Sequence, residues 1–214
     1  MKIGFFDTEV KKSPKDVGWD NYKQLGISVG CVVEKTIEIT NNKVDISSTS
    51  SHSFVDDPSG MVEKLNFMDM VVGYNNKSFD DNLICEFTGK DQGFLINNFD
   101  IQEYLDNKTG IKYCTGLDSL ARYTLNEGKP EDMDGAKAPK LWQKYKQNNN
   151  HKALIKLNNY CLKDCFLTSD VFVFGLKYGY VLIRPNKNEE LFGNMALKIN
   201  VDWKNLIDQK EIII

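Results

Sequence analysis

The chain has 214 residues, of which 41% are hydrophobic, and its formal net charge is −3. A chain of this length can bury one sizeable core, so we expect one main domain with extensions. No apolar run approaches the roughly 20 residues that span a bilayer, and the first residues lack the pattern of a secretory signal. Composition therefore predicts a cytoplasmic protein and argues against a membrane protein.

The five cysteines are scattered through apolar segments, which is typical of reduced core thiols rather than of a disulfide framework. Cys161 and Cys165 are spaced like two ligands on one helix. The chain has only two histidines and no second cysteine pair at ligand spacing, so we do not expect a zinc site.

Strand-like and helix-like patterns alternate along the chain, which predicts an α/β fold. Residues 3–6 form an apolar run without helical period, as in a strand buried on both faces. Pro14, Gly18 and Gly26 mark a loop over residues 11–26. The next predicted elements are two or three strands within 26–41 and 50–57 with turns at 34–35 and 41–42, a helix over 57–67, a strand over 70–73, a helix over 79–87, a strand edge at 99–101, and a helix over 115–125 capped at Thr115 or Ser119.

The first predicted strand ends in carboxylates. Asp7 and Glu9 follow the apolar run directly. Because side chains alternate along a strand, both project from the same face. The sequence therefore places two hard oxygen ligands side by side.

Residues 152–174 carry apolar side chains at the spacing of an amphipathic helix, after a break at 148–150. Tyr160 and Asp164, at i and i+4, share one face of this helix. Asp164 lies on or beside the stripe that should be buried, where an unpaired carboxylate is costly or gives up its charge. An acid at this position needs a cation or a strong partner.

Three segments in this order resemble the exonuclease motifs of the DEDD 3′-to-5′ exonucleases: D-x-E at Asp7 and Glu9, N-x₂₋₃-F-D at Asp80, and Y-x₃-D at Tyr160 and Asp164. In the histidine subtype a His lies five residues before the last Asp. Here that residue is Asn159, so the tyrosine subtype is favoured. The resemblance covers most of residues 1–183 and implies an RNase H-like fold, a mixed sheet flanked by helices.

The resemblance also implies the roles of these residues. Asp7, Glu9, Asp80 and Asp164 would be the ligands of two divalent ions, Mg²⁺ or Mn²⁺, and Tyr160 would orient the attacking water. Two details of the second motif stay open. Either Asn75 or Asn76 begins it, and Asp81 is the alternative ligand beside Asp80.

The implied activity is a two-metal 3′-to-5′ exonuclease that releases nucleoside 5′-monophosphates from single-stranded nucleic acid. Segments 18–29 and 134–145 are similar to a bacterial, archaeal and phage group of such enzymes, some fused to helicases. This favours DNA over RNA and suggests a helicase, replication or repair partner. The net negative charge is compatible with such a substrate, because two ions would offset four carboxylates and a chain end needs few phosphate contacts.

Six residues beside the motifs are candidate substrate contacts: Thr8, Trp19, Asn75, Asn76, Ser78 and Phe79. Trp19 would either stack on a terminal base or cover the core. Phe79 would either line the nucleotide pocket or be buried. Two groups of lysines, at 11, 12 and 15 and at 137, 140, 144 and 146, are equally well explained as solvated faces or as nucleic-acid contacts.

Each motif also has a plainer interpretation. Asp80 could cap the following helix, Tyr160 could pack in the core, and Asp164 could pair with Lys163 or Lys156 on a solvated face. Two rival functions follow: a non-catalytic nucleic-acid-binding or scaffold subunit, and a metal-dependent endonuclease on the same fold. The complete acidic set argues against the first, and the tyrosine argues against the second.

The last part of the chain differs in character. Residues 177–204 alternate between apolar and polar around turn-forming residues 185–188, which predicts a β-hairpin. We therefore expect an exonuclease domain over 1–183 and a hairpin extension over 178–214 that packs on it.

Overall fold

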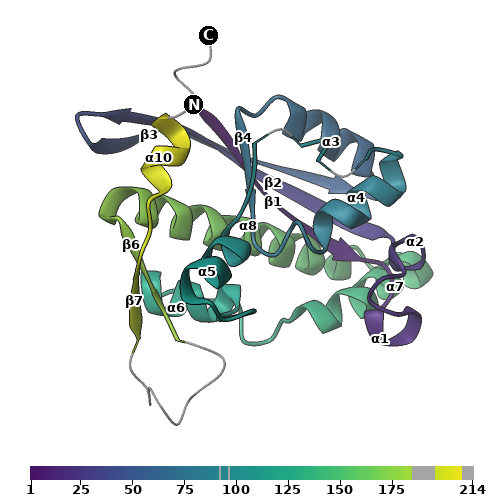
Figure 1. Cartoon of the computed structure of the whole chain (residues 1–214). Helices are drawn as coiled ribbons and strands as arrows, with labels where there is room; N and C mark the ends of the chain where they lie inside the picture. Colours follow the sequence, from purple (N-terminus) through teal and green to yellow (C-terminus); the bar gives the residue numbers. More distant parts are fainter. Residues whose placement is uncertain (92, 96, 185–195, 209–214) are drawn as a thin grey trace.

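The structure is a computed structural model that describes residues 1–91, 93–95, 97–184 and 196–208. Figure 1 shows its elements. In chain order they are β1 (Lys2–Val10), α1 (Pro14–Val17), α2 (Tyr22–Leu25), β2 (Ile27–Thr40), β3 (Lys43–Val55), α3 (Pro58–Asn66), β4 (Met70–Gly73), α4 (Asp80–Thr88), β5 (Asn98–Asp100), α5 (Ile101–Thr109), α6 (Leu117–Leu125), the 3₁₀ helix η1 (Gly135–Lys137), α7 (Ala138–Asn148), α8 (His151–Tyr178), β6 (Tyr180–Ile183), β7 (Leu197–Asn200) and α10 (Trp203–Asp208).

The main sheet has five strands in the order β3-β2-β1-β4-β5. β1 lies at its centre, antiparallel to β2 and parallel to β4. The predicted mixed sheet is therefore confirmed. Because the strand that carries Asp7 and Glu9 is central, both carboxylates are set within the fold rather than at a sheet edge.

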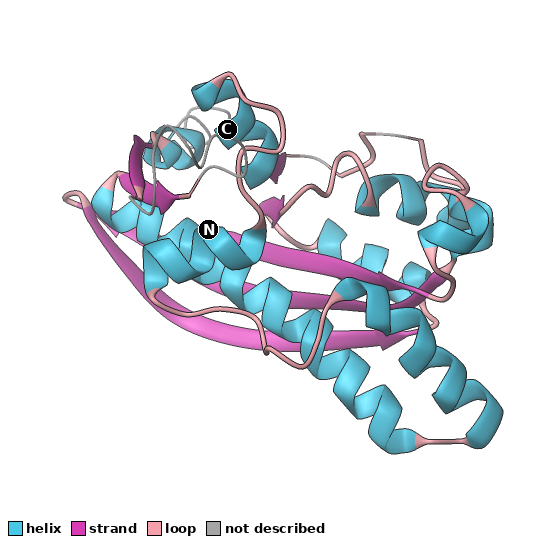
Figure 2. Ribbon diagram, turned by 90° about the horizontal axis from the view of Figure 1, so that it is seen from below, coloured by secondary structure: helices cyan, strands magenta, loops and turns pink. Residues whose placement is uncertain are grey.

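Helices cover both faces of this sheet. The long helix α8 packs on β1 and β2 on one face, and α3 packs on the other with α4 beside it (Figures 1 and 2). Neighbouring residues of β1 point to opposite faces, so Phe5 contacts Phe172 of α8, with ring centroids 5.7 Å apart. Phe6 belongs to the second apolar cluster, with side chains of α3 and α4 such as Leu65 and Leu83.

The predicted turn at Asn41 and Asn42 is confirmed. Both residues have left-handed backbones, with φ of 52° and 64°, and they join β2 to β3 in a hairpin where Thr40 pairs with Lys43. The left-handed region is one that asparagine tolerates better than most residues. The two asparagines therefore fix the register of a long antiparallel pair.

The predicted turn at Glu34 and Lys35 is wrong, because β2 runs unbroken from Ile27 to Thr40. The two charged residues suggested a solvated bend. In the fold each has a partner on a covering helix: Glu34 pairs with Lys64 of α3, and Lys35 pairs with Asp170 of α8. Pairing lets both charges stay within a continuous strand.

Other elements match the predicted ranges within a few residues, including α3, β4, α4, β5, α6 and α8. The cap of α6 is Gly116 rather than Thr115 or Ser119. The predicted loop over 11–26 contains two single-turn helices, α1 and α2. The sequence pattern did not predict α5 or α7. The break before α8 is confirmed, since Asn149 ends α7 in a left-handed conformation and Asn150 caps α8.

The C-terminal hairpin is also confirmed, because β6 and β7 form a two-stranded antiparallel sheet. Its predicted turn at 185–188 lies outside the described residues. The short helix α10 follows, and its Trp203 stacks on Phe172 with ring centroids 5.2 Å apart and planes 12° from parallel. The hairpin region thus packs on the same core as α8. None of the described helices is long and apolar enough to span a membrane.

Candidate metal centre

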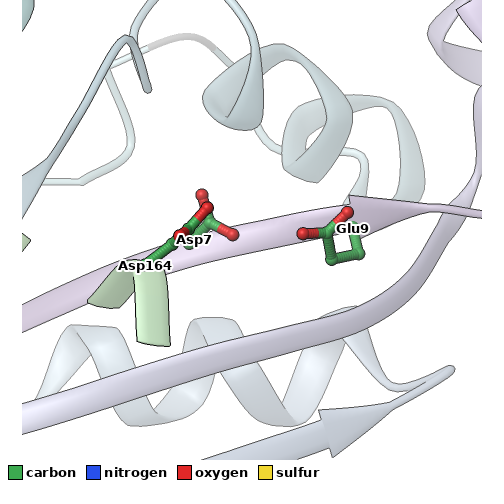
Figure 3. Close-up of side chains that lie close together, drawn as sticks. All are labelled: Asp7, Glu9 and Asp164. Carbon is green, nitrogen blue, oxygen red and sulfur yellow. The ribbon is translucent and has the colours of Figure 1, made fainter. Parts of the chain in front are cut away.

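Three carboxylates converge between β1 and α8. Asp7 and Glu9 project from β1 toward α8, and Asp164 projects from α8 toward the strand (Figure 3). One oxygen from each of the three lies within 4.8 Å of the others. Glu9 and Asp164 are buried and Asp7 is half-buried. The packing of α8 on β1 brings these residues into one cluster, although Glu9 and Asp164 are 155 positions apart in the sequence.

Small side chains set the close approach of α8 to β1. The thiol of Cys161 donates to the backbone carbonyl of Asp7 at 3.3 Å. One turn later, Cys165 donates to the carbonyl of Cys31 on β2 at 3.4 Å. Both thiols are fully buried. These contacts fix the rotation of α8 so that Asp164, between the two cysteines along the chain, faces the acidic strand.

The electrostatics of the cluster call for a cation. Burial raises the pKa of Asp7 and of Glu9 well above the ordinary range, and repulsion from Asp164 adds to it. The pKa of Asp164 is raised by burial as well, although Lys129 opposes the shift. Buried carboxylates with raised pKa values are common at functional sites.

The residues fit a divalent cation. Three carboxylates form a set of hard oxygen donors of the kind that Mg²⁺ and Mn²⁺ prefer. Oδ1 of Asp164 is buried and has no hydrogen-bond partner among the described residues, although Oδ2 is paired. A buried acceptor without a partner is costly, so this oxygen is poised to bind an ion.

Asp80 lies beside the cluster but is not one of the three converging carboxylates among the described residues. β4 pairs with β1 only as far as Phe5, so the backbone of β1 is open beyond that point. Oδ1 of Asp80 accepts the N–H of Thr8 there at 2.9 Å, and the Thr8 hydroxyl as well. Burial raises the pKa of Asp80 to about 7, with these hydrogen bonds opposing the shift.

The plain interpretation of Asp80 as a helix cap is wrong. Phe79 is at the N-cap position of α4 and makes no side-chain cap hydrogen bond, whereas Asp80 bonds to the acidic strand. Asp80 thus links the start of α4 to β1. This link keeps Asp80 close to Asp7. Repulsion from Asp80 raises the pKa of Asp7, by less than burial and repulsion from Asp164 do.

The second motif contains two residues with structural contacts. Asn76 has no exposed surface, and its amide donates to Asn98 at 2.7 Å. Asp81 accepts from the same Asn98 at 2.6 Å. Asn76 therefore joins the loop after β4 to β5, and its expected contact with the substrate stays a prediction. The alternative ligand Asp81 is already hydrogen-bonded away from β1.

Tyr160 is buried one turn before Asp164, and its neighbour is a residue that sequence patterns did not indicate. The ammonium of Lys129 donates to the Tyr160 hydroxyl at 3.2 Å and forms an ion pair with Oδ2 of Asp164. The expected surface partners of Asp164 are engaged elsewhere, Lys163 with Glu127 and Lys156 with Asp132. The solvated-face interpretation of Asp164 is therefore wrong.

The Lys129 ammonium is charged in this setting. Burial alone would lower the pKa of Lys129, but attraction to Asp164 and Tyr160 outweighs it, and the pKa lies above the ordinary value. Burial raises the pKa of Tyr160, with Lys129 opposing. The phenol of Tyr160 is therefore protonated at neutral pH.

The candidate substrate residues differ in exposure: Trp19 and Ser78 are exposed, Asn75 and Phe79 are half-buried, and Thr8 and Asn76 are buried. Trp19 is 64% exposed, so it does not cover the core. Its ring meets Phe79 edge-on at 6.0 Å, and Tyr22 meets Phe79 at 6.3 Å. Ser78 donates to the side chain of Asn75, and both line a cavity of about 510 Å³ in front of α5. The aromatic group thus lies at the start of α4, next to Asp80 in the chain, and the cavity is lined by other acids, Asp100, Glu103 and Asp106.

An α/β fold with a mixed five-stranded sheet and an acidic cluster on its central strand defines a protein of the RNase H-like class. The sequence profile of the RNase H superfamily matches residues 5–173. The chain belongs to this superfamily. A comparison with curated protein sequences found no match.

The chain is similar to solved structures at low identity. The family B DNA polymerase from the hyperthermophilic archaeon Pyrobaculum calidifontis matches 82% of the chain with a TM-score of 0.56 and 19% identity. E. coli Exonuclease I in complex with a dT13 oligonucleotide matches 83% of the chain with a TM-score of 0.35 and 12% identity. The chain spans 24% of the polymerase and 41% of Exonuclease I. The likeness to the polymerase concerns the fold.

Proposed function

We propose that the protein is a two-metal 3′-to-5′ exonuclease of the tyrosine DEDD subtype, acting on single-stranded nucleic acid and on DNA in preference to RNA. The observation that carries the proposal is the convergence of Asp7, Glu9 and Asp164, within 4.8 Å of one another, with Tyr160 one helical turn from Asp164. Membership of the RNase H superfamily supports it.

The residues that would hold two Mg²⁺ or Mn²⁺ ions are Asp7, Glu9 and Asp164, with Asp80 as the fourth carboxylate. When bound, such ions lower the pKa of water and offset the charge that develops on the phosphate and the leaving 3′ oxygen. The chain supplies the donors and holds them in place: β1 orients two, α8 orients the third, and Thr8 orients Asp80.

Tyr160 acts by positioning in this proposal. Its raised pKa keeps the phenol protonated, so it serves as a hydrogen-bond donor and not as a base. Its hydroxyl is held beside Asp164 by a shared contact with Lys129. A donor fixed at this point would orient the water that attacks the terminal phosphodiester.

The candidate substrate residues would hold the 3′ end. Trp19 offers a ring for base stacking, which tolerates any base and is worth about 1–3 kcal/mol. Thr8, Asn75, Ser78 and Phe79 would contact the terminal nucleotide. A preference for DNA and a helicase, replication or repair partner remain part of the proposal, supported by the resemblance of segments 18–29 and 134–145 and by the fold shared with a DNA polymerase.

The decisive assay uses 5′-labelled single-stranded DNA with Mn²⁺ or Mg²⁺. We expect stepwise shortening from the 3′ end and release of nucleoside 5′-monophosphates, slower digestion of RNA, and resistance of oligonucleotides with a blocked 3′ end. Asp7→Asn, which keeps the shape of the side chain but removes its charge, should be inactive. Cleavage of circular DNA would identify an endonuclease, and the absence of any cleavage would favour a binding subunit.

A further inference from the structure

The loop between α6 and α7 reaches into the acidic cluster through one side chain. Lys129 belongs to none of the three motifs and lies 35 residues before Asp164. Its side chain is 22% exposed, yet its ammonium contacts both Asp164 and Tyr160. Other lysines that tie this region to α8, such as Lys156 and Lys163, make their ion pairs outside the cluster.

The backbone of Lys129 is clamped on both sides. Its N–H donates to Oδ1 of Asp118 at 2.6 Å, and its carbonyl accepts from Arg122 at 3.3 Å. Asp118 and Arg122 are one turn apart on α6 and form an ion pair at 2.9 Å. Gly128 completes the clamp, because a Cβ there would come within 2.6 Å of the Arg122 guanidinium. Helix α6 therefore sets the position from which Lys129 extends.

The Lys129 ammonium contacts only one of the two Asp164 carboxylate oxygens. Oδ2 pairs with Lys129, whereas Oδ1 has no partner among the residues that the structure describes. An ion pair on one oxygen fixes the carboxylate rotation and leaves the other oxygen for an ion. The same ammonium donates to the Tyr160 oxygen, and Tyr160 itself hydrogen-bonds to the Asp164 side chain, so Lys129, Tyr160 and Asp164 are held together as one group.

We propose that Lys129 is a positioning residue for the hydrolysis: its ammonium sets Asp164 to present a single oxygen to the metal and sets Tyr160 as a hydrogen-bond donor to the attacking water. This inference rests on the proposed exonuclease function. Lys129 touches neither the ion nor the substrate in this account, and acts through the two residues that do.

A positioning lysine and a purely structural lysine differ in their effect on ion binding. A positive charge beside Asp164 repels an incoming cation, so Lys129 weakens ion binding while it orients the groups that use the ion. Removing the charge should therefore change metal affinity and turnover in opposite directions. A lysine that only stabilised the loop would change both in the same direction.

The experiment compares the wild type with Lys129→Met, Lys129→Arg and the matched control Lys163→Met, which also breaks a tie between the same loop and α8. Isothermal titration with Mn²⁺ measures ion affinity, and digestion of labelled single-stranded DNA at saturating Mn²⁺ measures kcat and KM separately. Thermal melts of each variant report whether it is folded.

For Lys129→Met we expect Mn²⁺ to bind about tenfold more tightly. We expect kcat to fall about 10- to 100-fold with KM for DNA unchanged. Lys129→Arg should recover most of kcat, and Lys163→Met should match the wild type. Tighter Mn²⁺ binding with undiminished kcat would mean that the lysine merely stands in for an ion, and would overturn the inference. So would weaker Mn²⁺ binding together with lower kcat.

Two further outcomes separate this inference from the proposed function. A wild type that cleaves no substrate overturns the proposed function, whereas a cleaving wild type with an equally fast Lys129→Met variant overturns the inference alone. If Lys129→Met does not fold, Asp118→Ala tests the positioning role instead. This variant removes the acceptor of the Lys129 backbone N–H without changing a residue of the acidic cluster. It should lower kcat several-fold with KM unchanged, and an unchanged kcat would refute the positioning role.

Discussion

Asp80 accepts hydrogen bonds from both the backbone N–H and the hydroxyl of Thr8, the residue between Asp7 and Glu9 on the acidic strand. This contact spans 72 residues of sequence and uses the part of β1 that β4 leaves unpaired. It orients Asp80 at the side of the cluster. The second motif is therefore joined to the first by Thr8, in addition to any ion that the carboxylates share.

Thr8→Val should weaken this link without changing the shape of the side chain. We expect a loss of about 1 kcal/mol in the free energy of unfolding, because one buried hydrogen bond to a carboxylate disappears. The pKa of Asp80 should rise further, since the Thr8 hydroxyl lowers it. Urea denaturation at pH 7 checks the first effect, with Thr8→Ser, which keeps the hydroxyl, as the control. Equal stability of the two variants would show that the hydroxyl contributes nothing.

The pH dependence of stability should carry the signature of Asp80. Its folded pKa of about 7 exceeds the ordinary 3.8, so the folded state holds a proton that the unfolded state releases between these values. Without metal, Asp80 therefore favours folding at low pH, and this contribution is lost as the pH rises from about 4 to 7. Asp80→Asn should match the wild type near pH 4 and be more stable than it near pH 8. Parallel stability curves for the two proteins would contradict the raised pKa.

Divalent ions should reverse this trend. Protons compete with the ion for the raised-pKa carboxylates, so Mn²⁺ should raise Tm strongly at pH 8 and little at pH 5. At a free concentration 100 times Kd the stabilisation would be about 2.7 kcal/mol. Asp164→Asn should lose most of this effect, and chelation by EDTA should abolish it. A Tm shift that is equally large in Asp164→Asn would place the ion elsewhere.

Trp19→Ala should affect substrate binding more than turnover. Loss of one stacking platform predicts an increase in KM of about tenfold with little change in kcat. Phe67 offers a matched control, because it is an aromatic residue at the end of α3 that is 76% exposed and has no proposed role. Steady-state digestion of single-stranded DNA compares Trp19→Ala with Phe67→Ala. Equal KM values in both variants would remove Trp19 from the proposed substrate contacts.

The faces that carry the acidic residues could be anticipated because they follow local periodicity, whereas the RNase H-like fold was implied by the family resemblance. The pleat of β1 places Asp7 and Glu9 on one face of the strand, and the helical period places Tyr160 and Asp164 on one face of α8. These rules depend only on neighbouring residues, so they can be read from the sequence. That these two faces meet was implied by the family resemblance and not by periodicity.

The contacts that the sequence did not predict join residues that are far apart in the chain. Lys129 lies in a loop with no period, and only the clamp from Asp118 and Arg122 aims it at the cluster. Lys35 suggested a turn because its partner, Asp170, is 135 residues away. The bond from Asn76 to Asn98 of β5 was not predicted either, because it joins two segments 22 residues apart. Polar pairs of this kind carry no sequence period.

Anomalous X-ray diffraction from crystals grown with Mn²⁺ shows whether an ion binds between β1 and α8. We predict a strong anomalous peak within about 2.2 Å of carboxylate oxygens of Asp7 and Asp164, with Oδ1 of Asp164 as its ligand. A second peak beside Asp80 is expected when a nucleotide is bound. A map without a peak between β1 and α8, at a Mn²⁺ concentration that raises Tm, would contradict the account.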